Sequence, residues 1–271
     1  MKTQTAVIAL VAVLFAVPAF ADHNRIDEQG RKQGHWTEFP EVDELLSAEG
    51  EYVDGKTRGH WVLRWANGTV GEGPMVDGKR HGKWVERFDS GNVFEGPFVG
   101  GKRHGHWVLR GANGGVQEGP FVAGKKHGDW VERLANGDVF EGPFVGGKRH
   151  GDWVLRYANG TVHEGPFVDD KRHGYWVERY ADGDVGKGEY VNGKAHGHWV
   201  LRSADGIVER GPIVDGKRHG KWVFQAPDSI TEGSYVEGKM HGMWLYVPTN
   251  GEESLTCWKN GNKIDNTMDC L

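Results

Sequence analysis

Histidine comes nearest to forming a chemical site in this sequence, because it recurs at almost constant spacing. Eight histidines follow one another at intervals of 22 or 23 residues: His81, His104, His127, His150, His173, His196, His219 and His241. In stacked hairpins they would lie about 9.6 Å apart, whereas nitrogen ligands of one zinc ion lie roughly 2.1 Å from it. We therefore predict no metal site. An effect of acid on packing or self-association, near pH ~6.5, stays open.

Catalytic motifs do not emerge from the remaining polar residues. We find no nucleophile elbow, phosphate-binding loop or HExxH segment. Catalysis needs one preorganised constellation, and here nearly every polar residue recurs many times at wide spacing. The sequence therefore predicts a protein that is not an enzyme and binds no cofactor.

Basic pairs beside the histidines form a candidate binding edge. The positions are Lys79, Arg80, Lys102, Arg103, Lys125, Lys126, Lys148, Arg149, Lys171, Arg172, Lys217 and Arg218. Stacked, they would line one edge, which could contact an anionic lipid, a glycan or an acidic protein surface. The alternative is a set of solvated turns balanced by neighbouring glutamates.

The spacing of tryptophan shows that the chain is built from one unit repeated many times. A Gly-x-Trp motif begins at Gly34 and occurs ten times in all, mostly every 23 residues. Nine of its tryptophans are the predicted repeat core: Trp61, Trp84, Trp107, Trp130, Trp153, Trp176, Trp199, Trp222 and Trp244. Buried, they would form the stacking core. Exposed in a groove, they would offer a platform for sugars or peptides.

Each unit predicts a β-hairpin. Two stretches rich in valine and aromatic residues alternate with two glycine-containing turns, and pairs such as Asn113-Gly114 are expected to supply the positive φ of tight turns. A lone hairpin is marginal in water, so the units should stack. We predict an all-β, elongated single-sheet solenoid of about ten stacked antiparallel hairpins, about 95 Å long at about 9.6 Å per repeat.

Two further patterns lie within the repeat. Proline recurs in the first strand, as at Pro97, and should begin a strand or turn its missing N–H away from a partner. Leucine and glutamate alternate two residues after tryptophan, as at Glu86 and Leu109. Because a position that accepts both residue types is not expected to be fully buried, we expect it at the edge of one face.

The ends depart from the repeat and define the predicted domains. Residues 1–21 resemble a signal peptide, with an apolar run followed by Ala19-Phe20-Ala21, and the chain is expected to be secreted or periplasmic with no later transmembrane segment. Residues 22–49 form a degenerate capping repeat in which 41–48 could form a short helix. Residues 50–251 are the array. Residues 252–271 form a C-terminal cap closed by a Cys257–Cys270 disulfide.

Charge argues against one class of partner. Without Lys2, 32 lysines and arginines face 38 aspartates and glutamates, a net charge of −6. A general nucleic-acid binder is normally basic, so nucleic acid is not an expected partner.

The motifs resemble a known family. Gly-Lys-Arg-His-Gly at 78–82, 101–105, 147–151 and 216–220, and Val-Asn-Gly-Lys-Ala-His-Gly at 191–197, are similar to the turn of MORN repeats. Tryptophan in the Gly-x-Trp motif is nearer the bacterial, antitoxin-like variant. The resemblance implies stacked hairpins and a scaffolding, oligomerising or lipid-contacting role.

These observations lead to a functional hypothesis. We expect a non-catalytic exported repeat protein that binds a protein, or itself, through an extended curved β face. The alternative is a cell-envelope binder of anionic lipid or glycan that uses the basic edge or exposed tryptophan.

Overall fold

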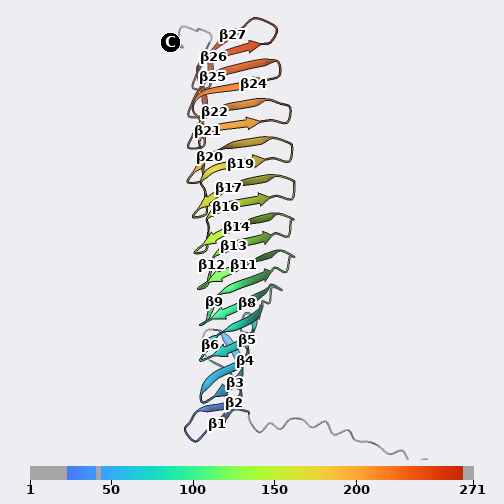
Figure 1. Cartoon of the computed structure of the whole chain (residues 1–271), viewed down its shortest axis with the longest axis vertical. Helices are drawn as coiled ribbons and strands as arrows, with labels where there is room; N and C mark the ends of the chain where they lie inside the picture. Colours follow the sequence, from blue (N-terminus) through green and yellow to red (C-terminus); the bar gives the residue numbers. More distant parts are fainter. Residues whose placement is uncertain (1–22, 41–43, 265–271) are drawn as a thin grey trace, which may run out of the picture.

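The computed structural model describes residues 23–40 and 44–264. Over these ranges the chain contains no helix, and its 28 strands form one antiparallel sheet in which each hairpin pairs with the next. Figure 1 shows the result, an elongated stack of hairpins running from one end of the molecule to the other. The predicted all-β array is confirmed. A search of the described residues for a helix able to cross a membrane finds none.

The N-terminal part consists of five strands. Its elements are β1 (Arg25–Ile26), β2 (Lys32–Glu38), β3 (Leu45–Val53), β4 (Lys56–Trp65) and β5 (Val70–Val76). The helix expected over 41–48 is wrong from Leu45 onward, because these residues pair with β4 as part of β3. Residues 41–43 lie outside the described ranges, as does the predicted signal peptide. Strand pairing on both sides of β3 outweighs the weak helical signal of this short segment.

The central part repeats a unit of one seven-residue strand followed by an interrupted second strand. Its elements are β6 (Lys79–Arg80), β7 (Gly82–Arg87), β8 (Val93–Val99), β9 (Lys102–Arg103), β10 (Gly105–Arg110), β11 (Val116–Val122), β12 (Lys125–Lys126), β13 (Gly128–Arg133), β14 (Val139–Val145), β15 (Lys148–Arg149), β16 (Gly151–Arg156), β17 (Val162–Val168), β18 (Lys171–Arg172) and β19 (Gly174–Arg179).

The C-terminal part continues the stack of hairpins, but its second strand is unbroken in β21 and β26. Its elements are β20 (Val185–Val191), β21 (Lys194–Arg202), β22 (Val208–Val214), β23 (Lys217–Arg218), β24 (Gly220–Ala226), β25 (Ser229–Val236), β26 (Lys239–Pro248), β27 (Ser254–Lys259) and β28 (Asn262–Ile264). Cys257 lies in β27 and is only 1% exposed. Cys270 falls outside the described residues, so the disulfide between them stays a prediction.

Proline determines where the second strand is interrupted. Pro97 lies inside β8, not at its start, and the following strand is split at His104 into β9 and β10. Where Glu189 takes the place of proline it pairs with His196, and β21 runs unbroken from Lys194 to Arg202. A proline has no N–H to donate to the partner strand, so the pairing fails opposite it.

The two turns of each repeat have different geometry. The tight turns are the two-residue ones that join a Val to a Lys, as at Asp77-Gly78, where both residues have positive φ of 48° and 77°. The Asn-Gly pairs at 67–68, 113–114, 136–137 and 159–160 lie instead in longer loops, where glycine alone has positive φ, as at Gly114 with 89°. The expectation that pairs such as Asn113-Gly114 make the tight turns is therefore wrong, whereas Asn192-Gly193 does make one, with φ of 51° and 86°. The Asn113 side chain accepts from the Gly115 N–H at 3.0 Å, which stabilises the longer loop.

Candidate binding faces

The sheet has two chemically different faces, because successive side chains of a strand point to opposite sides. We call the side that carries Trp84, Glu86 and Phe98 the aromatic face, and the side that carries Val85, Glu95 and Val99 the open face. Cross-strand partners lie on the same face: Trp84 is opposite Gly96, and Val85 is opposite Glu95.

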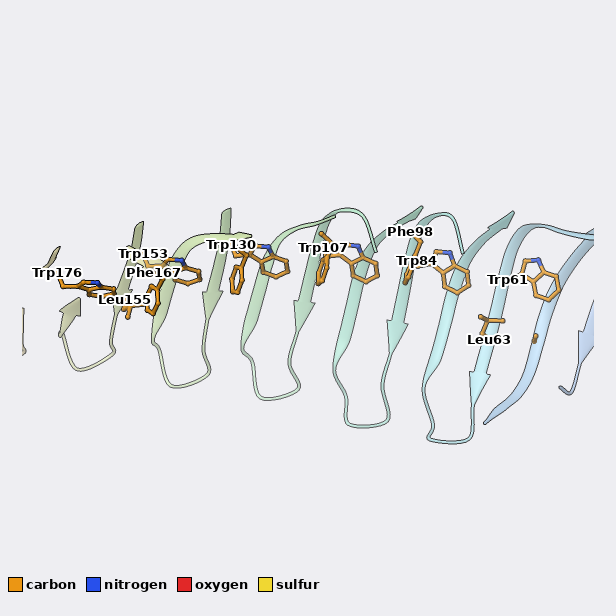
Figure 2. Close-up of a cluster of buried hydrophobic side chains, with 13 residues drawn as sticks. Trp61, Leu63, Trp84, Phe98, Trp107, Trp130, Trp153, Leu155, Phe167 and Trp176 are labelled. Carbon is orange, nitrogen blue, oxygen red and sulfur yellow. The ribbon is translucent and has the colours of Figure 1, made fainter. Parts of the chain in front are cut away.

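The predicted core tryptophans are all buried on the aromatic face. None of the nine is more than 4% exposed, and Figure 2 shows several of them in a row along successive hairpins. The exposure of Trp107 and Trp153 distinguishes a buried core from an exposed platform, and these residues are 0% and 1% exposed. The exposed-tryptophan form of the lipid or glycan alternative is therefore wrong for these residues.

Each indole is fixed by two contacts. It packs against the backbone of a glycine in the preceding strand, where a Cβ on Gly96 would come within 2.4 Å of the Trp107 ring. In seven of the nine its Nε1–H donates to the carbonyl of the residue ten positions back, as from Trp107 to Pro97 at 2.9 Å. Trp61 donates instead to the Arg58 carbonyl at 3.1 Å. The polar atom of a buried indole is thereby satisfied without water. The Nε1 of Trp244 is a buried exception, with no partner among the described residues.

Tryptophan does not stack on tryptophan, as a simple repeat would suggest. Aromatic rings from neighbouring strands alternate edge to face: Trp84 to Phe98 at 6.1 Å, Phe98 to Trp107 at 5.1 Å. The alternation continues without a break through Phe121, Phe144, Phe167 and Tyr190 to Trp199. Edge-to-face contact is the favoured geometry for such rings and links each hairpin to the next.

The candidate basic edge separates into two sets. In each pair the second residue turns to the aromatic face, because it lies opposite an apolar residue of that face, as Arg103 lies opposite Phe98 and Arg80 opposite Met75. The Arg103 guanidinium carbon lies 4.7 Å from the centroid of the Trp107 ring, and the Lys126 Nζ lies 4.2 Å from that of Trp130. The half-buried set that covers the aromatic rings in this way is Arg80, Arg103, Lys126, Arg149, Arg172 and Arg218.

These half-buried cations are paired with acidic groups. Glu86 accepts from Arg80 Nη1 at 2.5 Å and from Arg103 Nη2 at 2.6 Å. Lys126 Nζ donates to Glu132 at 2.6 Å, and Arg172 Nη1 donates to Glu178 at 2.5 Å. Of the seven positions that alternate between Leu and Glu, four are buried: Leu63, Glu86, Leu155 and Glu178 are 9%, 6%, 4% and 5% exposed, so the expectation of a face edge is wrong for them. Leu109, Glu132 and Leu201 are half-buried. A buried carboxylate is tolerated there because arginines reach it from one or two hairpins.

The first residue of each pair stays in solvent on the open face. Lys102 lies opposite Val99 across a tight turn, and Val99 is 51% exposed. Nine such cross-strand pairs, which we call the Val–Lys stripe, follow one another: Val53–Lys56, Val76–Lys79, Val99–Lys102, Val122–Lys125, Val145–Lys148, Val168–Lys171, Val191–Lys194, Val214–Lys217 and Val236–Lys239.

Sequence reasoning missed two thirds of the residues of this stripe. It selected six of these lysines with their neighbours but not Lys56, Lys194 and Lys239, and it passed over all nine valines. Every valine in the stripe is 41% to 51% exposed. The available signal was the constant Val-x-x-Lys spacing, which in a two-residue hairpin places the two side chains opposite each other on one face.

The rest of the open face is made of surface ion pairs. Arg133 donates to Glu118 at 2.8 Å, and Arg156 to Glu141 at 2.7 Å. The Lys83 ammonium lowers the pKa of the Glu95 carboxyl through a hydrogen bond, against a smaller opposing effect of burial. Such exposed pairs contribute little stability, typically about 0–1 kcal/mol. They neutralise much of the middle of the open face, whereas the stripe repeats an exposed lysine in nine successive hairpins.

A buried polar cluster on the aromatic face distinguishes one repeat. Glu178 accepts hydrogen bonds from Arg172, from Tyr180 Oη at 2.8 Å and from Tyr190 Oη at 2.9 Å. Arg172 Nη2 also lies 3.0 Å from His163 Nδ1. Burial and the hydrogen bonds to Glu178 raise the pKa of both tyrosines, and burial, aided by the Arg172 charge, lowers that of His163 against the opposing Glu178 charge.

No group of three or more potential metal ligands is found among the described residues. The recurrent turn histidines lie mostly in solvent, and the backbone N–H of several donates to the proline carbonyl, as from His104 to Pro97 at 2.9 Å.

The chain matches the model of one protein family, described as the MORN repeat, over residues 49–70, 72–93, 94–116, 163–185, 187–208 and 232–243. No curated protein matches it.

Solved structures show weak likeness. The TCP10 domain of Danio rerio CPAP, solved in complex with a peptide of STIL, is 12% identical with a TM-score of 0.38, covering 77% of this chain and 86% of that one. The TCP domain of Drosophila melanogaster SAS-4, with a proline-rich motif of Ana2, is 13% identical with a TM-score of 0.34, covering 64% and 83%. The CPAP G-box domain is 15% identical with a TM-score of 0.36, covering 64% and 97%. Likeness at this level does not identify a function.

Proposed function

We propose that this chain, which belongs to the MORN-repeat family, is a non-catalytic scaffold that binds a protein partner, or a second copy of itself, through the Val–Lys stripe. The observation that carries the proposal is the repetition of one exposed valine beside one exposed lysine in nine successive hairpins. Burial of the tryptophans leaves the stripe as the regular exposed apolar feature of the array. Monomeric proteins seldom leave such a row uncovered without a partner.

The geometry suggests how such a partner is held. Successive rungs lie about 9.6 Å apart, so an elongated surface with acidic and apolar groups at the same interval would engage several rungs at once. Each rung contributes little, but linked rungs gain affinity through effective concentration. We therefore expect binding to be graded with the number of rungs and to weaken as salt screens the lysines.

Charge reversal on the stripe tests this proposal. Lys102→Glu with Lys148→Glu removes two rungs, and Lys187→Glu with Lys221→Glu makes the same change in net charge outside the stripe. Proteins captured from cell extract by the wild-type chain, including added copies of the chain itself, should be lost with the first variant and kept with the second. Equal capture by both variants contradicts the stripe as the contact.

A second candidate rests on the same lysines. Their regular exposure also favours an anionic lipid or glycan surface of the cell envelope. Sedimentation with vesicles of anionic and of neutral lipid distinguishes the two: vesicle binding that needs anionic lipid and is lost in Lys102→Glu/Lys148→Glu, without protein capture, supports this candidate.

We also propose export and a C-terminal disulfide, on the sequence of residues 1–21 and on the two cysteines. Expression with the native N-terminus should give a secreted or periplasmic product that begins at Asp22. Non-reducing peptide mapping should join Cys257 to Cys270, and two free thiols in the exported protein would contradict the disulfide.

A further inference from the structure

The aromatic face has a gap where a glycine replaces a larger side chain that most repeats place in the longer loop. This loop position holds Trp65, Phe88, Leu134, Tyr157 and Tyr180, but residue 111 is glycine. A cavity of about 680 Å³ opens at this place, lined by Phe94, Leu109, Gly111, Gln117, Leu134 and Ala135 among others. Ser203, also small, stands at the same loop position of a later repeat, where a second cavity of about 310 Å³ opens.

Neighbouring repeats show what normally fills the space. The Phe88 ring packs at 4.6 Å on Phe94, and Tyr157 packs between Phe140 and His163, at 5.4 Å from each. A ring at position 111 would lie correspondingly between Phe94 and Gln117. Because the ring is missing, Leu109 is only partly buried, whereas its counterparts Leu63 and Leu155 are 9% and 4% exposed.

The loops at 111–115 and 134–138, which border the cavity, also lack a hydrogen bond that joins other neighbouring loops. In four other loops a side chain accepts from the next loop's alanine N–H, as Asn92 does from Ala112 at 2.9 Å and Asp138 from Ala158 at 2.8 Å. The residue that would do this for Ala135 is Gly115, so the Ala135 N–H, at the margin of the cavity, has no acceptor among the residues that the structure describes. Two independent departures from the repeat thus coincide at one place.

We propose that this cavity is a preformed notch for one aromatic side chain of a protein partner, with a neighbouring backbone carbonyl or carboxylate of that partner accepting from the Ala135 N–H. The ring would take the place of the missing residue, against Phe94 and Leu109. The notch rests on the proposed scaffold function, and it supplies one specific position beside the repeated, equivalent rungs of the stripe. A single deep apolar contact of this kind is where interfaces concentrate their binding energy.

The probe that tests the notch is N-acetyl-L-tyrosinamide, which carries one ring and two amide carbonyls. Added to the full chain, it should shift the NMR signals of the Leu109 and Leu134 methyl groups saturably, with the millimolar affinity typical of so small a ligand. Gly111→Tyr restores the side chain of other repeats and should weaken binding at least tenfold. Gly111→Ala makes the same backbone change without filling the notch and should keep affinity within about twofold.

Gly115→Asp supplies the missing acceptor and should lower the affinity for the probe about threefold or more, because the Ala135 N–H then donates to the new carboxylate. Should Gly111→Tyr not fold, Gly111→Leu serves, because leucine already stands at this position in the next loop. No saturable shift, or equal binding by wild type and the filled variant, overturns the proposal. The proposal is also overturned if methyl glucoside shifts the NMR signals of these methyl groups and the tyrosine probe does not, because the notch would then be a sugar site.

Protein capture separates the notch from the scaffold function. If the wild-type chain does not bind the probe but still captures partners in a stripe-dependent manner, the notch is contradicted and the scaffold function is supported. If it binds the probe but captures no partner, the notch is supported and the scaffold function is contradicted.

Discussion

Arg103 Nη2 donates to Glu86 Oε2 at 2.6 Å across the boundary between two hairpins. Glu86 also accepts from Arg80 of its own hairpin, so one buried carboxylate joins consecutive repeats. Both arginines lie over core aromatic rings, with the Arg80 guanidinium carbon 4.3 Å from the Phe98 centroid. The ion pair therefore belongs to the core of the array and not to a solvated edge.

Neutralising this carboxylate should weaken the repeat interface. Glu86→Gln is expected to lower the free energy of unfolding by about 1–2 kcal/mol, below the ~3–5 kcal/mol of fully buried pairs because the arginines keep some solvent contact. Urea unfolding measures it. Glu72→Gln on the open face, which removes an exposed pair with Arg87, should cost under about 1 kcal/mol. Equal losses from both variants would show that Glu86 does not contribute as a buried group.

Gly96 should not tolerate a methyl group, because its Cβ would lie 2.4 Å from the Trp107 ring. Gly96→Ala is expected to destabilise the chain by about 1–3 kcal/mol through overpacking. Gly186→Ala is the matched control, since Gly186 also lies in a strand on the aromatic face and its Cβ would meet nothing nearer than 3.4 Å. Thermal unfolding of both variants measures the difference, and a Gly96→Ala chain as stable as the control would contradict the packing role.

His163 should make the array less stable in mild acid. Burial and the Arg172 charge lower its pKa in the folded chain below the ordinary 6.5, although the Glu178 charge opposes this. The unfolded chain then binds more protons, so stability is full above about pH 6.5 and falls as pH decreases below it. His163→Phe, the residue found at the equivalent Phe94 and Phe140, should reduce this loss. Unfolding midpoints between pH 7 and pH 5 test it, and the same pH dependence in both chains contradicts it.

Removing two central repeats should shorten the molecule without unfolding it. Deleting residues 105–150 removes 46 residues and joins His104 to Gly151, which keeps both the stacking register and the Leu/Glu alternation. Stability is nearly a sum of repeat and interface terms, so cooperative folding should survive. Small-angle scattering of the exported chain should give a maximum dimension near 95 Å or more, and the deletion should reduce it by about 19 Å. An unchanged maximum dimension would contradict the linear stack.

Sequence alone determined the repeat, the strand period and the array. The 23-residue spacing and the glycine-rich turns predict hairpins, and the hairpins must stack because an isolated hairpin cannot cover its own apolar side. The sequence alone also showed no catalytic motif. The positions of Trp107 and Trp153 in the repeat were readable, but their burial was not, since a flat row of rings can equally be a core or a platform.

Tertiary structure decided which face each polar side chain joins. Lys102 and Arg103 are neighbours in sequence and were treated as one edge, yet the pleat sends them to opposite faces, one into solvent and one over Trp107. Glu86 looked like a surface residue until two arginines from different hairpins were found to reach it. The gap at Gly111 exists only relative to rings that stack from neighbouring repeats. Each of these features depends on contacts between hairpins, and those contacts are set by the register of the sheet.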